Sequence, residues 1–104
     1  MPLIRVTAQE GTFDKATQNK FIEVVTNAVL TAEGADPKNS GAQSLAWAYF
    51  TEQKKGDIYV GTEIFDTPPV LIRVTTPIGS LNSDENSELA KSINAIVNDF
   101  IGPY

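Results

Sequence analysis

The sequence predicts an α+β domain in which two strand–helix repeats place two helices on one face of a small mixed sheet. The first observation behind this prediction is internal repetition: residues 3–34 align without a gap with residues 71–102, and both copies begin LIRVT. The second is that a glycine and then a helical period of apolar residues follow each strand. With 104 residues, the chain is expected to form one domain, 1–104, built of repeats at about 2–64 and 70–102.

Each copy begins with a β-branched run that predicts a strand, at roughly 2–8 and 70–76. The helix that follows is bounded by residues at matching positions: Asp14 and Asn82 as N-caps, and Gly34 and Gly102 as left-handed C-caps. The two copies are therefore expected to fold alike.

The segment between the copies reads as two further strands, at about 44–52 and 57–64, joined as a hairpin by the turn QKKGD. This gives the order β-α-β-β-β-α, with the edge of the sheet closed by 57–64 or by a partner's segment. The face opposite the helices would carry Arg5 and Arg73 and remain open. An open face of this kind favours a homo-oligomer.

Composition excludes several kinds of site. The chain has no histidine and no cysteine, which removes disulfides, Ser-His and Cys-His nucleophile pairs and the usual ligands of zinc. A net charge of −5 with scattered basic residues argues against nucleic acid. We see no signal peptide and no apolar run long enough to span a bilayer, so the expected protein is cytoplasmic and independent of membranes.

Pro2 is the candidate for catalysis. Removal of Met1 would leave its nitrogen as a free secondary amine, and an α-amino group titrates near pH ~8, with burial lowering the pKa further. Such an amine can act as a general base in a chain that has no histidine. The alternative is that Pro2 only begins an edge strand.

Several short motifs together resemble one family. The start PLIRVTAQEG ends in the pair Glu10-Gly11, residues 51–63 read TEQKKGDIYVGTE, and the second strand ends at Ile78-Gly79. This pattern resembles the tautomerase superfamily, which includes 4-oxalocrotonate tautomerase and macrophage migration inhibitory factor, and in particular its two-copy members.

The resemblance implies a cofactor-independent tautomerase or isomerase that uses Pro2 as general acid/base on small keto or unsaturated carboxylic acids. It also implies a homotrimer with a barrel-like core, and neither metal nor cofactor. Related members act instead as decarboxylases, hydratases or dehalogenases.

The sequence departs from the family at the substrate-binding positions. Thr12 and Trp47 stand where the short members have arginines, and Ile58, next to Tyr59, stands where they have an aromatic residue. The substrate-binding candidates are consequently taken from elsewhere as well: Arg73, Lys38, Tyr59, Trp47 and Ile78.

Each candidate has a structural alternative. Arg73 and Arg5 would form a polar layer at a subunit interface, Lys38 would be a solvated loop residue, and Trp47 and Tyr59 would pack in the core or an interface. The missing arginines also leave open a tautomerase-fold protein that binds without catalysis. An unrelated ferredoxin-like ligand binder is a further alternative.

Overall fold

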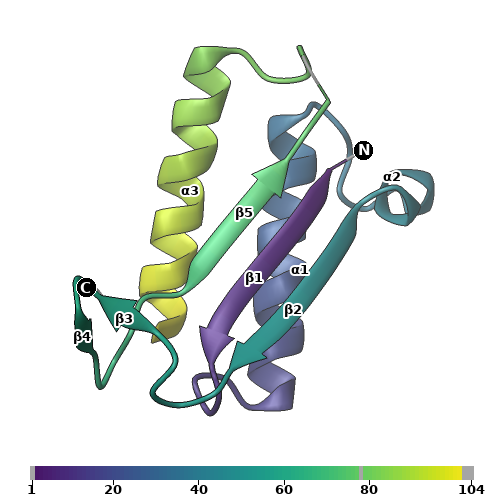
Figure 1. Ribbon diagram of the computed structural model, residues 1–104. Coiled ribbons are helices and arrows are strands. Elements are labelled where there is room, and N and C mark those ends of the chain that lie inside the picture. The colour runs from purple at the N-terminus through teal and green to yellow at the C-terminus, as the bar shows by residue number, and fades with distance from the viewer. Residues whose placement is uncertain (1, 78, 102–104) are drawn as a thin grey trace.

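The computed structural model describes residues 2–77 and 79–101. Its main sheet has three strands in the order β2-β1-β5, formed by β1 (Leu3–Gln9), β2 (Trp47–Gln53) and β5 (Leu71–Thr75) (Figure 1). The central strand β1 pairs in parallel with β2 and antiparallel with β5. The predicted small mixed sheet is confirmed.

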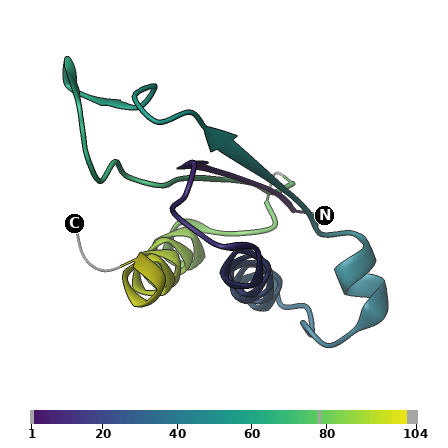
Figure 2. The same cartoon turned by 90° about the horizontal axis from the view of Figure 1, so that it is seen from below.

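Two helices, α1 (Lys15–Ala32) and α3 (Ser83–Ile101), lie side by side on the same face of this sheet (Figure 2). No helix in the described part of the chain is long and apolar enough to cross a membrane. The other face of the sheet has no helix over it, as the sequence predicted.

The predicted helix boundaries follow from side-chain hydrogen bonds. The Asp14 carboxylate accepts a bond of 2.7 Å from the backbone N–H of Thr17. At α3, the Asn82 side chain accepts from the N–H of Glu85 at 2.8 Å, and the Glu85 carboxylate accepts from the N–H of Asn82 at 3.0 Å. This reciprocal pair is a capping box, which satisfies amides that have no partner inside the helix.

At the other end of α1, Gly34 has a φ of +80°, the left-handed conformation that was predicted for a C-cap. Its equivalent in the second copy, Gly102, lies outside the described residues.

The core lies between the sheet and the helices. Alternate residues of β1 point at the helices, so that Ile4, Val6 and Ala8 are fully buried. They pack against the buried stripe of α1 and against α3, that is Phe21, Val25, Val29 and Leu89.

The two copies are related by a local two-fold axis. Arg5 stands opposite Arg73, its own equivalent in the second copy, and Ile4 stands opposite Val74, the equivalent of Val6. Antiparallel pairing of a strand with its own repeat therefore centres the axis on the Arg5–Arg73 pair.

The predicted hairpin of 44–52 with 57–64 is wrong. Residues at the start of the first segment form a short helix, α2 (Ser40–Ser44), and β2 then pairs with β1 instead of with the following segment. Residues in the second segment fold on themselves as β3 (Tyr59–Val60) and β4 (Glu63–Ile64).

The tight turn between β3 and β4 contains Gly61, whose φ of +65° suits a two-residue hairpin turn. Consequently this segment does not close the edge of the main sheet.

The β3–β4 hairpin projects away from the layered body of the protein (Figure 2). It exposes more than half of Tyr59 and Ile64, and Phe65 just beyond it is also exposed. Exposed apolar side chains on a projecting hairpin are typical of a surface that meets another protein chain.

Candidate active site at the start of strand β1

Pro2 is buried at the end of the sheet where β1 begins. Its carbonyl oxygen accepts a hydrogen bond of 3.1 Å from the backbone N–H of Trp47, the first residue of β2. On the other side of β1, Leu3 stands opposite Thr75, the last residue of β5. Pro2 is thus held between the beginning of one strand and the end of another.

Lys38 lies in the connection between α1 and α2, at the same end of the sheet as Pro2 (Figure 1). Its backbone N–H donates to the Asp36 carboxylate at 2.9 Å, and the Gln43 side chain donates to the carbonyl of Pro37 at 2.7 Å. These bonds fix the backbone of the connection, while the Lys38 side chain is exposed and forms no ion pair with any described residue.

Trp47 lies at the Pro2 end of the sheet but on its open face. Its register partner is Leu3, and its indole N–H donates to the carbonyl of Ser44 at 3.3 Å. About half of Trp47 and half of Leu45 remain exposed. Together they form an apolar surface beside the start of β1.

The remaining predicted residues are not brought to Pro2 within the chain. Arg73 is in the middle of β5, on the open face, whereas Ile4, which shares the alternation of Pro2, points at the helices. Tyr59 lies beyond the far end of β2, and six residues along a strand separate the two ends by about 20 Å. Ile78 lies outside the described residues.

Tyr59 instead lines a different hollow, of about 410 Å³, at the end of the sheet where β5 begins. Its lining residues are Thr7, Gln53, Asp57, Ile58, Tyr59, Pro69, Val70 and Leu71. Val70 is the second-copy equivalent of Pro2. The local two-fold axis therefore relates this hollow to the Pro2 end of the sheet.

The Glu10-Gly11 motif has a structural role at this far end. The Glu10 carboxylate accepts from the N–H of Lys55 at 3.2 Å, and the Glu52 carboxylate is 3.4 Å from the N–H of Gly11. The two motif segments that suggested the family thus join the loop after β1 to the turn after β2.

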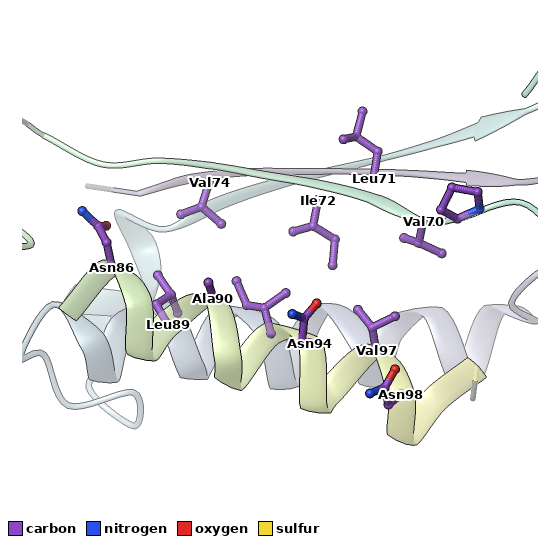
Figure 3. A pocket seen from close by; sticks show the side chains of 12 residues that line it. Val70, Leu71, Ile72, Val74, Asn86, Leu89, Ala90, Asn94, Val97 and Asn98 are labelled. Atoms are coloured by element: carbon purple, nitrogen blue, oxygen red, sulfur yellow. The ribbon is translucent and has the colours of Figure 1, made fainter. Parts of the chain in front are cut away.

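A larger groove, of about 710 Å³, runs between β5 and α3 (Figure 3). Ile72 and Val74 point into it from the strand, and Asn86 and Asn94 lie on its helical wall. The lining contains no acid, base or nucleophile, so this groove offers contacts but no proton-transferring group. Among the described residues, no cluster of acidic side chains is suited to hold a metal ion.

The open face holds a further hollow of about 360 Å³, which the sequence did not point to. Its lining combines Arg5 and Arg73 with Thr7, Tyr49, Thr51 and Leu71. Alternation of side chains places these residues on one face once the register is known, and the register could not be deduced without the parallel pairing of β1 and β2.

No protein-family profile and no curated protein sequence matches the chain. Solved structures do match. One is Pt0534 inactivated by 2-oxo-3-pentynoate, with a TM-score of 0.79, 17% identity, and coverage of 97% of this chain and 75% of that one. A fused 4-OT symmetric trimer matches with a TM-score of 0.77 and 19% identity, over 98% of this chain and 76% of that one.

The chain has the tautomerase-superfamily fold, of the two-copy type. A macrophage migration inhibitory factor from Toxoplasma gondii supports the same assignment, with a TM-score of 0.72 and 19% identity over 96% of this chain and 77% of that one. The tautomerase fold therefore extends over almost all of this chain, although few residues are shared.

Proposed function

We propose that this protein is a cofactor-independent tautomerase-superfamily enzyme in which Pro2, freed of Met1, is the general acid/base. The carrying observation is the placement of Pro2, buried at the start of the central strand and fixed through its carbonyl by the N–H of Trp47. Burial favours the neutral form of an amine, and the neutral form is the one that accepts a proton.

The proposed reaction moves a proton between oxygen and carbon. The Pro2 nitrogen accepts the proton of an enol hydroxyl, and the resulting ammonium returns a proton to the adjacent carbon as the carbonyl forms. No electron acceptor or metal is needed for this balance. A structural neighbour, Pt0534, is inactivated by 2-oxo-3-pentynoate, a small unsaturated keto acid, which supports substrates of that class.

Lys38 is the cation best placed to hold the substrate's carboxylate. It lies at the Pro2 end of the sheet and has no ion-pair partner in the described part of the chain. A cation at this position would also stabilise negative charge that develops on the enolate oxygen. Arg73 is the alternative for this role, and it lies on the opposite face of the sheet from the Pro2 position.

The proposed site is completed by a neighbouring copy in a homotrimer. Tyr59 lies about 20 Å or more from Pro2 of its own chain, because the length of β2 separates them. It sits on the projecting hairpin, which can reach a second copy, and fused 4-OT neighbours are trimers. Trp47, exposed at the Pro2 end, would form the wall of the same pocket.

A second candidate function is a binding scaffold without catalysis. The observation that favours it is the pair of substitutions at family arginine positions. The Thr12 hydroxyl donates to the carbonyl of Gln9 at 2.7 Å and so closes a turn, and Trp47 carries no charge. Neither residue can hold a carboxylate as an arginine does.

A spectrophotometric enol-to-keto assay on phenylpyruvate tests the proposal. Protein shown by mass to lack Met1 is compared with Pro2→Ala and with protein that retains Met1, whose Pro2 nitrogen is an amide. We expect kcat/KM to fall about 10²–10⁴-fold in both, since a general base contributes that much. Equal activity in all three would refute the role of Pro2, and absence of activity in all three would favour the scaffold.

The role of Lys38 has a matched control. Lys38→Gln is expected to raise KM about tenfold, because a charge-assisted hydrogen bond to the substrate is lost. Lys54→Gln removes the same charge from an exposed turn at the far end of β2 and should leave KM unchanged. A similar KM in both variants would exclude Lys38 as the carboxylate-binding residue.

A further inference from the structure

The open face of the sheet has charge of one sign only. Alternation along the three strands brings eleven residues to this face: Leu3, Arg5, Thr7, Gln9, Trp47, Tyr49, Thr51, Gln53, Leu71, Arg73 and Thr75. Arg5 and Arg73 are the charged residues among them. This is notable in a chain whose net charge is −5.

The two arginines are direct neighbours. Arg5 and Arg73 are register partners on antiparallel strands, where Cα atoms are about 5 Å apart. Like charges in this arrangement destabilise a sheet. A pair at this position therefore calls for a balancing anion.

The described part of the chain does not provide that anion. The ion pairs among the described residues join Lys20 to Glu23 and Lys91 to Glu88, along the two helices. Glu52, on the strand beside β1, is the register partner of the buried Ala8 and so belongs to the helix-facing side. Neither guanidinium has a hydrogen bond or an ion pair within residues 2–77 and 79–101.

Neutral donors surround the pair. Tyr49 is the register partner of Arg5 on the side away from Arg73, so the three residues form one row across the sheet. Thr7 and Thr51 occupy the next row, and all five line the hollow of about 360 Å³. Two guanidinium groups and three hydroxyl groups converge on one space that is open to solvent.

The geometry points to a binding site for a small polyvalent oxyanion, of the phosphoryl or carboxylate class, between Arg5 and Arg73. Each guanidinium can donate two parallel hydrogen bonds to a pair of anionic oxygens. The local two-fold axis passes between the arginines, so the site suits an anion with two equivalent charged ends, such as a diphosphate or a dicarboxylate. The inference does not rest on the proposed function, because Pro2 is not part of this site.

The test measures binding at constant ionic strength by titration calorimetry. Inorganic pyrophosphate and malonate are the probes, so that the two anion classes are distinguished. Wild-type protein should bind at least one of them saturably, with a thermal midpoint that rises with anion concentration. Arg5→Gln and Arg73→Gln should each weaken the affinity about tenfold, since each removes charge-assisted bonds.

Matched controls separate this site from general charge and from the Pro2 site. Lys54→Gln removes one positive charge elsewhere and should bind within twofold of wild type. Pro2→Ala should do the same, even though it is expected to lose tautomerase activity. Circular dichroism of each variant, with Arg5→Lys and Arg73→Lys as milder substitutions, checks that the fold is retained.

Three results would overturn the inference. The first is the absence of saturable binding of either probe to wild-type protein. The second is affinity that survives in both Arg→Gln variants, which would place the anion elsewhere. The third is pyrophosphate or malonate that competes with phenylpyruvate and loses its affinity in Pro2→Ala, which would make Arg73 part of the Pro2 site.

Discussion

Phe21 is the aromatic residue that joins the two helices, and its removal should be costly. Its side chain is fully buried, and its ring centroid lies 4.9 Å from that of Phe13 and 5.2 Å from that of Phe100 on α3. Replacement of a buried phenylalanine by alanine costs about 3–5 kcal/mol, through lost transfer free energy and the cavity that remains. A domain has only about 5–15 kcal/mol of stability, so Phe21→Ala should leave the protein close to unfolding.

The contact between α1 and α3 can be measured on its own. The rings of Phe21 and Phe100 are inclined at 80°, the edge-to-face arrangement, which contributes about 1 kcal/mol beyond burial. Phe100 is only half-buried, so Phe100→Ala should cost about 1–2 kcal/mol. A double-mutant cycle with both changes should therefore show a coupling of about 1 kcal/mol.

Urea unfolding followed by circular dichroism at a fixed protein concentration is the assay. Phe65→Ala serves as the control, because this phenylalanine is 46% exposed and should change the free energy of unfolding by less than ~0.5 kcal/mol. A coupling near zero, or a cost for Phe21→Ala no greater than for Phe65→Ala, would refute the view that this ring contact joins the two copies.

Three further changes have defined outcomes. The hydrogen bond from the backbone N–H of Thr17 lowers the pKa of Asp14 below its ordinary 3.8, so the ionised form stabilises the fold above that pH and the contribution is lost as pH falls through the lowered pKa; urea midpoints at pH 7 and pH 3 should therefore differ less in Asp14→Asn than in wild type. Gly34→Ala should lower the free energy of unfolding by about 1–2 kcal/mol in the same assay, because a φ of +80° is strained for alanine although no atom obstructs its Cβ; an unchanged value would mean that the backbone relaxes. Inactive Pro2→Ala and Tyr59→Ala chains should regain phenylpyruvate activity when refolded together if Tyr59 serves a neighbour's Pro2, and additive inactivity would contradict a shared site.

The parts of the fold set by local signals could be predicted from the sequence. Asp14 and Asn82 form N-caps because their side chains reach the first-turn amides, which is a property of a few adjacent residues. The alternation that buries Ile4 and Val6 is likewise visible in the strand itself. The repeat of LIRVT extended both results to the second copy.

The prediction of the central segment was wrong because pairing partners are not a local property. The turn QKKGD is a good hairpin turn, but β2 lies alongside β1, and Gly61 lets the following residues form their own hairpin. The same limit applies to the candidate site. The sequence pointed to Pro2, Lys38 and Tyr59 separately, while their separation within one chain depends on the direction of β2.

The local two-fold axis has one exception, which is the chain terminus. A duplicated chain has two copies of strand, helix and hollow but only one amino end. In the second copy the position of Pro2 is taken by Val70, whose nitrogen is always in a peptide bond with Pro69. Each chain can therefore offer at most one terminal amine to two equivalent ends of the sheet. The hollow beside Val70 is free of the constraint that a reactive amine imposes on its neighbours, and its residues can change without loss of the chemistry at Pro2.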